Sequence, residues 1–307
     1  MSVLPAAPLW VRAAAALLRR LPAGRYRLMD RLPRRAPPFA ARLAPELGGM
    51  RFRCDLRDSV AREACFTGRY EPQETALLRA LLGPGAVFVD VGANWGYFSL
   101  LAAHRVGPGG RVLALEPDPR LFAVLRDNLA ANGLRHAVAL PLAAAEAPGT
   151  LALAGYEEAG GNWGVSSVVT AAAEAAPRFA VQGARVDDVL DAQGVGRVDL
   201  LKLDVEGAEL LALRGMRAGL AAGRYRRVLL ELHPRAPGGA EMVAAALEAL
   251  RGAGYAGWSI DHSPAAARRA AYARSPDARG FLRPTAEADP GDPWPHQLWT
   301  APGDEPR

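Results

Sequence analysis

The stretch Phe88-Val89-Asp90-Val91-Gly92-Ala93-Asn94-Trp95-Gly96 decides the fold of this chain. An apolar run of strand length is followed at once by a glycine-rich turn, and residues 97–105 then have the pattern of a helix. Glycine lets the backbone adopt positive φ and lets a ligand approach the main chain closely. The stretch therefore predicts a strand, a tight turn and a helix, with a candidate ligand site at the turn.

Apolar runs of strand length alternate with helical stretches on both sides of this unit. Strands that are apolar at nearly every position are buried on both faces, which indicates a parallel sheet with helices on each side. We expect an α/β, doubly wound, Rossmann-like sheet whose ligand lies at the carboxyl ends of the strands. The predicted strands are 86–91, 111–115, 137–143, 150–154, 198–203, 227–232, 255–260 and 297–300, and the predicted helices are 71–82, 97–105, 119–132, 208–214 and 240–253.

Length and charge distribution suggest two unequal parts. The chain has 307 residues and a formal net charge of +5, and residues 1–70 hold 14 arginines against five acidic residues. We predict a basic, partly helical N-terminal extension at 1–66, followed by the α/β domain at 67–307. The extension is either a solvated segment or a peripheral contact for an anionic membrane surface. Basic residues are not interleaved with aromatic ones, so no nucleic-acid partner is expected.

The sequence shows no pattern typical of a membrane span or a secretory signal, and it has only two cysteines. No apolar run approaches the ~20 residues of a membrane span, and the arginines at 19 and 20 follow the apolar stretch at 9–21 instead of preceding it as in a secretory signal. A cytoplasmic location is therefore expected. Cys54 and Cys65 match no zinc-ligand spacing, and we expect two free buried thiols.

The glycine turn separates two classes of nucleotide-binding protein. A dinucleotide fingerprint would read G-x-G-x-x-G, but Asn94 and Tyr97 stand where its second and third glycines belong, which disfavours an NAD-dependent dehydrogenase. The observed D-x-G-x-N-x-G has the form of the S-adenosylmethionine loop of Rossmann-like methyltransferases. The candidate cofactor residues are Asp90, Gly92, Asn94 and Gly96, with Glu116 after the next strand as acceptor for the ribose hydroxyls.

Further segments resemble the FkbM family of S-adenosylmethionine-dependent methyltransferases, over about residues 88–255. The segments that carry the resemblance are 89–99 (VDVGANWGYFS), 110–117 (GRVLALEP), 128–134 (NLAANGL), 186–190 (VDDVL), 201–209 (LKLDVEGAE) and 229–234 (LLELHP). The resemblance implies methyl transfer to a hydroxyl of a sugar, glycan or natural product, with the C-terminal strands completing the sheet. The family usually has a polar stretch after the third strand. Here that stretch is Ala143-Ala144-Ala145-Glu146, which leaves Glu146 as the candidate adenine contact.

Candidate catalytic groups follow the fourth and fifth strands. Methyl transfer to a hydroxyl needs alignment and removal of a proton. His233 is the leading candidate base because histidine titrates near neutrality, Asp204 is the second, and Glu231 shares their edge of the sheet. A capping or packing role is the alternative for His233. Lys202 is the one lysine among 37 basic residues, and we expect it to form an ion pair with Asp204 or Glu231.

The acceptor site is predicted in the glycine-rich, aromatic segment 155–170, where Asn162, Trp163 and Ser166 could contact a sugar, together with Glu206. An ordinary surface connection is the alternative. Carboxylates near Asp204 could bind Mg²⁺, but a divalent cation is not expected. The competing functions are an N-methyltransferase, for which loss of His233 would matter little, and a non-catalytic cofactor-binding or scaffold protein.

Overall fold

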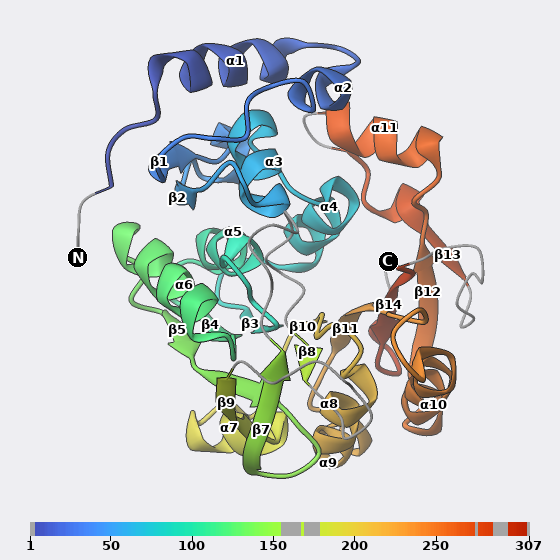
Figure 1. Cartoon of the computed structure of the whole chain (residues 1–307). Coiled ribbons are helices and arrows are strands. Elements are labelled where there is room, and N and C mark those ends of the chain that lie inside the picture. Colours follow the sequence, from blue (N-terminus) through green and yellow to red (C-terminus); the bar gives the residue numbers. More distant parts are fainter. Residues whose placement is uncertain (1–3, 155–166, 169–178, 274–275, 285–293, 306–307) are drawn as a thin grey trace.

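The computed structural model describes residues 4–154, 167–168, 179–273, 276–284 and 294–305. An eight-stranded sheet runs through the molecule, with helices on both sides (Figure 1). In spatial order its strands are β13 (Leu282–Pro284), β12 (Ala256–Ile260), β14 (His296–Thr300), β11 (Arg227–Glu231), β10 (Leu200–Leu203), β3 (Val87–Val91), β4 (Arg111–Leu115) and β5 (Ala137–Leu140).

The strand order places a crevice beside β3. From β3 the chain first builds outward through β4 and β5, and it later returns to the other side of β3 with β10 and β11. These five strands are parallel, so their carboxyl ends share one edge of the sheet. In sheets of this kind ligands bind where the strand order reverses, which here is between the ends of β3 and β10.

The two faces of the sheet belong to two apolar cores. Phe88 and Leu200 lie in one core, whereas their chain neighbours Val89 and Leu201 lie in the other. Successive side chains of a strand point to opposite faces, so both faces are covered, as predicted for a doubly wound sheet. The covering helices of this part are α4 (Pro72–Leu81), α5 (Tyr97–Val106), α6 (Pro119–Ala131), α7 (Val186–Ala192), α8 (Glu209–Gly215), α9 (Arg217–Ala221), α10 (Gly239–Gly252) and α11 (Pro264–Tyr272).

The parallel arrangement does not extend to the C-terminal strands of the sheet. Strand β14 is antiparallel to both β11 and β12, and β12 is antiparallel to β13. The last strand therefore enters the sheet from the opposite direction, and its first residue, His296, pairs with the last residue of β11, Glu231. This register brings a histidine from the C-terminal part to the carboxyl edge of the parallel strands.

The predicted strand 137–143 is two strands. Residues Ala137–Leu140 belong to the central sheet as β5, whereas Leu142–Ala144 form β6 of a second sheet. Pro141 lies between them, and proline interrupts a strand because it lacks a backbone donor. The second sheet has the order β6, β9 (Phe179–Ala184), β7 (Gly149–Ala154) and β8 (Ser167–Val168).

The N-terminal segments pack on one face of the central sheet and lie at the top of Figure 1. They comprise α1 (Leu9–Arg20), α2 (Arg25–Met29), the antiparallel pair β1 (Phe39–Arg42) and β2 (Arg51–Cys54), and α3 (Ser59–Thr67). The sequence predicted short helices here but not the strand pair. Helix α1 leaves Leu9, Trp10 and Leu17 exposed, and membrane contact of this segment stays a prediction.

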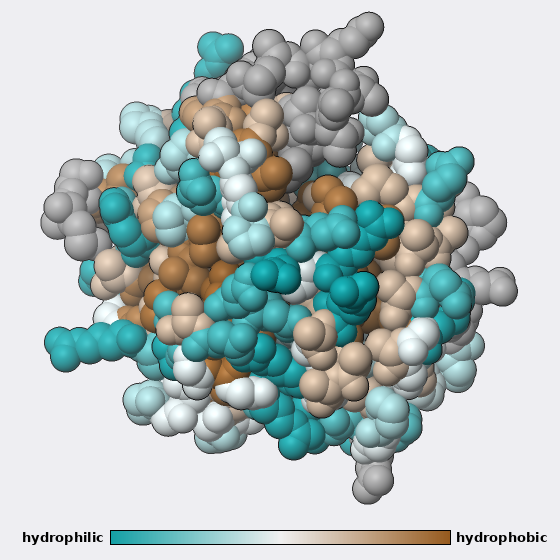
Figure 2. Space-filling view, turned by 90° about the horizontal axis from the view of Figure 1, so that it is seen from below, coloured by the Kyte–Doolittle hydropathy of each residue, from teal (hydrophilic) through white to brown (hydrophobic). Residues whose placement is uncertain are grey.

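On the face seen from below, hydrophilic residues gather in the middle and hydrophobic residues flank them (Figure 2). Among the described residues, no helix is long and apolar enough to cross a membrane. Cys54 and Cys65 are both buried and free, as expected.

Candidate active site

A cavity of about 500 Å³ lies at the carboxyl edge of the parallel strands. The residues that line it come from the turns after β3, β4, β10 and β11, from β6 and β7, and from segments near α3, α4 and the C-terminal strands. Acidic residues and histidines are concentrated in its wall. They are Glu71, Glu116, Asp204, Glu206, Glu231, His233, His262 and His296.

The turn after β3 forms one wall of the cavity. At Gly92 in this turn there is no space for a side chain. Gly92 has a φ of 83°, and a β-carbon there would lie 1.8 Å from the carbonyl oxygen of Asp204. Asn94 also adopts a left-handed conformation, with φ of 52°, and its Oδ1 is buried without a hydrogen-bond partner in the part of the chain that the structure describes. Gly96, with φ of 81°, packs against Leu125. The turn thus presents backbone and an unsatisfied amide oxygen at the switch point of the sheet.

Glu116 holds this turn from the end of β4. The backbone N–H of Asn94 donates to its Oε2 at 2.8 Å, and the N–H of Asp118 donates to its Oε1 at 2.9 Å. Each carboxylate oxygen has two acceptor sites, so both keep a free lone pair for a ligand. Burial raises the pKa of Glu116 to about 8.

Asp90 lies beneath the turn and supports it. It is buried, it is not among the cavity-lining residues, and the hydroxyl of Ser99 donates to its Oδ2 at 2.6 Å. This bond ties the end of β3 to α5. Burial raises the pKa of Asp90 to about 6.

Lys202 and Asp204 form the ion pair that the sequence predicted. The ammonium lies 2.6 Å from Asp204 Oδ2 and 4.9 Å from the centre of the Phe98 ring. Burial alone would lower the pKa of Lys202, but the charges of Asp204, Glu71 and Glu231 reverse this and raise it. The raised pKa favours the charged form of Lys202, which lies beside the cavity-lining carboxyl group of Asp204.

His233 is held by a carboxylate that sequence reasoning missed. Its Nδ1 lies 2.8 Å from Oε1 of Glu209, and its Nε2 lies 3.3 Å from Glu206 Oε2 and 3.7 Å from Glu231 Oε1. Burial alone would lower the pKa of His233, but the hydrogen bond to Glu209 and the charges of Glu209, Asp204 and Glu206 raise it to about 9. Glu209 is the last residue of the LKLDVEGAE segment, 201–209, which carries the family resemblance, but no role was predicted for it.

Glu231 is shared between histidines. His296 Nε2 lies 3.2 Å from Glu231 Oε2, so Glu231 lies between His233 and His296. Burial alone would raise the pKa of Glu231, but His296, Lys202 and His233 lower it to about 2.

Glu206, which lies near His233, has a backbone φ of 52°. Burial and the charge of Asp204 raise the pKa of Glu206 to about 8.

The predicted adenine contact is not part of this cavity. Glu146 is exposed, lies outside the cavity wall and pairs with Arg214 at 3.3 Å. Asn162, Trp163 and Ser166 lie outside the described residues, so the predicted acceptor segment stays a prediction. The other predicted residues divide into two groups. Asp90, Gly96 and Lys202 do not line the cavity, whereas the following do: Gly92, Asn94, Glu116, Asp204, Glu206, Glu231 and His233.

The sequence matches the profile of the methyltransferase FkbM domain over residues 90–256. The chain belongs to the FkbM methyltransferase family. Methyltransferase sdnD of Sordaria araneosa is 36% identical over 154 residues, which cover 42% of this chain and 59% of that protein. The 31-O-demethyl-FK506 methyltransferase FkbM of Streptomyces tacrolimicus is 32% identical over 180 residues, covering 50% of this chain and 67% of that protein.

A solved FkbM methyltransferase from Methylobacillus flagellatus is 17% identical, with a TM-score of 0.44, and the likeness covers 78% of this chain and 52% of that one. Like the two curated relatives, it extends well beyond the part that this chain matches. The FkbM domain match includes the glycine turn, Glu116, Lys202 and His233, but it excludes Glu74, His262 and His296. Those three residues come together only in the folded chain.

Proposed function

We propose that this FkbM-family chain transfers a methyl group from S-adenosylmethionine to a hydroxyl of a small-molecule or glycan acceptor. The observation that carries the proposal is the convergence of the glycine turn, Glu116 and the His233 cluster on one cavity. A cofactor loop and a candidate base in one cavity are what a group-transfer enzyme needs. The NAD reading is less well supported because Asn94 and Tyr97 replace the glycines of the dinucleotide fingerprint.

The residues present fit this cofactor. Gly92 lets the turn lie directly against the carbonyl oxygen of Asp204 at the wall of the cavity, and Asn94 Oδ1 is a buried acceptor without a hydrogen-bond partner among the described residues. Glu116 has free lone pairs for the two ribose hydroxyls. Leu142, Ala143 and Leu153 give the cavity an apolar wall against which an adenine ring can pack, in place of the predicted contact from Glu146.

The charge of the cavity also fits. When bound, S-adenosylmethionine supplies a methyl group on a positively charged sulfur, and the thioether product leaves without that charge. The cavity wall offers the ionised carboxylate of Glu231 and the carboxyl groups of Asp204 and Glu206, whose ionised forms a bound cation would favour. Opposite charges within a poorly solvated site attract strongly, so the wall favours a cationic cofactor over an anionic dinucleotide.

His233 is the proposed base, and Glu209 is its positioning partner. Glu209 accepts from Nδ1, so it fixes the ring and leaves Nε2 to take a proton from the acceptor hydroxyl. S-adenosylmethionine bound at the glycine turn and Glu116 would supply the methyl group, and Nε2 of His233 would take up the proton of the acceptor hydroxyl. Burial and Glu231 raise the pKa of Asp204 and Lys202 opposes this, whereas the pKa of Glu231 is lowered by His296 and Lys202, so Glu231 above all stabilises the imidazolium that results.

Matched acceptors test the direction of transfer. The purified protein is incubated with methyl-labelled S-adenosylmethionine and with pairs of hydroxylated compounds and their amino counterparts. We expect label on the hydroxyl compounds and a large loss in His233→Ala. Label on the amines alone, with His233→Ala unaffected, would replace the proposal with N-methylation. Cofactor binding without transfer to any acceptor would favour the scaffold function.

A further inference from the structure

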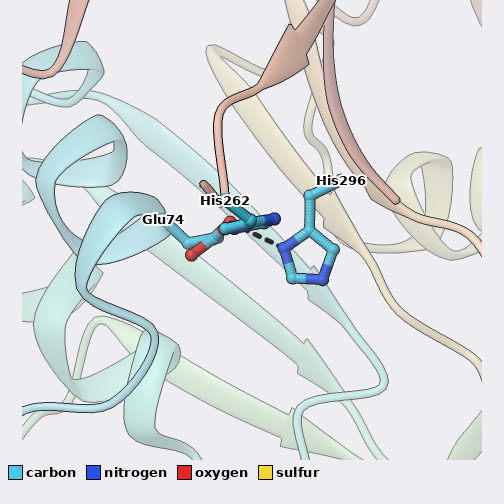
Figure 3. Close-up of side chains that lie close together, drawn as sticks. All are labelled: Glu74, His262 and His296. Atoms are coloured by element: carbon cyan, nitrogen blue, oxygen red, sulfur yellow. Dashed lines mark hydrogen bonds and ion pairs between the residues drawn. The ribbon is translucent and has the colours of Figure 1, made fainter. Parts of the chain in front are cut away.

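Three residues from separate parts of the chain meet beside the cavity, and the sequence motifs involve none of them. Glu74 lies in the first turn of α4, His262 follows β12 and His296 begins β14. Figure 3 shows both imidazoles directed at the Glu74 carboxylate. His296 Nδ1 lies 2.6 Å and His262 Nε2 lies 2.8 Å from the same oxygen, Glu74 Oε1. One ligand atom from each residue lies within 4.8 Å of the other two, which is the spacing of ligands around one ion.

The carboxylate of Glu74 has a second oxygen that accepts no hydrogen bond from the described residues. Glu74 is only 1% exposed, and its other oxygen, Oε2, is buried without a hydrogen-bond partner among the described residues. An unsatisfied buried carboxylate oxygen is costly, and a bound cation would satisfy it. The ring centres of His262 and His296 lie 4.6 Å apart, edge to face.

The surroundings of His296 have the arrangement of a metal ligand. Its Nδ1 points at the cluster, and its Nε2 lies 3.2 Å from Glu231 Oε2. Histidines that bind metals commonly donate the other ring N–H to a carboxylate, which fixes the ring and its tautomer. Glu231 would therefore orient His296 without itself binding the ion.

We propose that Glu74, His262 and His296 bind one divalent transition-metal ion of the zinc type. Two imidazole nitrogens and one carboxylate suit such an ion better than Mg²⁺, which prefers oxygen ligands. Three protein ligands leave a coordination position open, as in catalytic zinc sites. His262 and His296 also line the cavity, so an oxygen of the acceptor can reach that position. This last role rests on the proposed function, whereas the ion site does not.

The test is a metal titration that needs neither cofactor nor acceptor. The full chain is freed of metal with a chelator and titrated with Co²⁺, whose visible absorption reports its ligands, and with Zn²⁺ in competition against a chromophoric chelator. We expect one equivalent of ion per chain in the wild type. His262→Ala should weaken binding at least tenfold. Because the His262 side chain is 28% exposed, this variant should fold, and circular dichroism would verify that.

His136→Gln is the matched control, since His136 lies elsewhere and contacts the carbonyl oxygen of Ala103. It should bind the ion like the wild type. Absence of stoichiometric binding by the wild type would overturn the proposal, as would equal binding by wild type and His262→Ala. If the wild type binds the ion but does not bind S-adenosylmethionine, the proposed function is overturned and the proposed ion site is not.

Discussion

Glu231 and His296 stand directly opposite each other on the antiparallel strands β11 and β14, with His296 Nε2 3.2 Å from Glu231 Oε2. This pair joins the two halves of the site. Glu231 also lies 3.7 Å from the proposed base His233, and His296 also lies against Glu74. The reversed last strand thus connects the region of methyl transfer with the proposed ion site.

Gly92 tests the steric fit of the cofactor turn. Gly92→Ala should destabilise the fold and abolish cofactor binding, because the new β-carbon would overlap the carbonyl oxygen of Asp204. Gly85→Ala is the control, since Gly85 has nearly the same φ of 81° but no atom within 4 Å of a β-carbon. The control should lose only the ~1–2 kcal/mol of a left-handed alanine. Denaturant unfolding measures both, and equal losses would contradict the account.

Lys202 tests the buried ion pair. Lys202→Met should destabilise the protein by about 3–5 kcal/mol, because it leaves Asp204 and its neighbouring carboxylates buried without their cation. Lys202→Arg should also be less stable than the wild type, because a planar guanidinium does not fit the space that the compact ammonium of Lys202 occupies. Adding Asp204→Asn to Lys202→Met should recover part of the loss. An unaltered unfolding free energy in Lys202→Met would refute this role.

His233 and Glu209 test the base. His233→Ala should lower kcat/KM by about 10²- to 10⁴-fold, the usual contribution of a general base. Rates should rise with pH through the pKa of His233, because only the neutral ring accepts a proton, and that pKa is raised to about 9 by Glu209, Asp204 and Glu206.

Glu209→Gln should move this inflection to lower pH, because it removes the hydrogen bond and the charge that raise the pKa. A merely structural role of Glu209 would change the rate at every pH and leave the inflection in place. The pH profile of kcat/KM for the acceptor, at saturating cofactor, distinguishes the two.

Cofactor binding should release protons between pH 7 and 8. The pKa values of Glu116 and Glu206 are both raised to about 8, mainly by burial, and a bound cation favours their ionised forms. Binding enthalpies measured in phosphate and in Tris should therefore differ, since the two buffers take up protons with different heats. Glu146→Gln, outside the cavity, should show the same difference as the wild type. Identical enthalpies in both buffers would contradict the prediction.

Sequence pattern was sufficient for the parallel half of the sheet. Strands β3, β4, β10 and β11 were predicted to within two residues at each end, because strands buried on both faces read as continuous apolar runs. The turn at Gly92 and the ion pair of Lys202 with Asp204 were also predicted, since each involves residues close in sequence.

The features that the sequence did not predict depend on contacts between segments far apart in the chain. Glu74 lies 188 positions from His262 and 222 positions from His296, and no spacing in the sequence relates them. They meet because β14 enters the sheet antiparallel to β11, and the direction of a C-terminal strand is not encoded in its own apolar pattern. The pair of β1 and β2 was missed because arginines interrupt its short runs.

The most direct test of the central claim is a calorimetric titration of S-adenosylmethionine into the purified protein. The wild type should bind one equivalent, and Glu116→Ala should bind far more weakly, because it loses the acceptor for the ribose and the anchor of the Asn94 turn. NAD, titrated in parallel, should not bind. Binding of NAD in place of S-adenosylmethionine, or equal binding of S-adenosylmethionine by wild type and Glu116→Ala, would contradict the account.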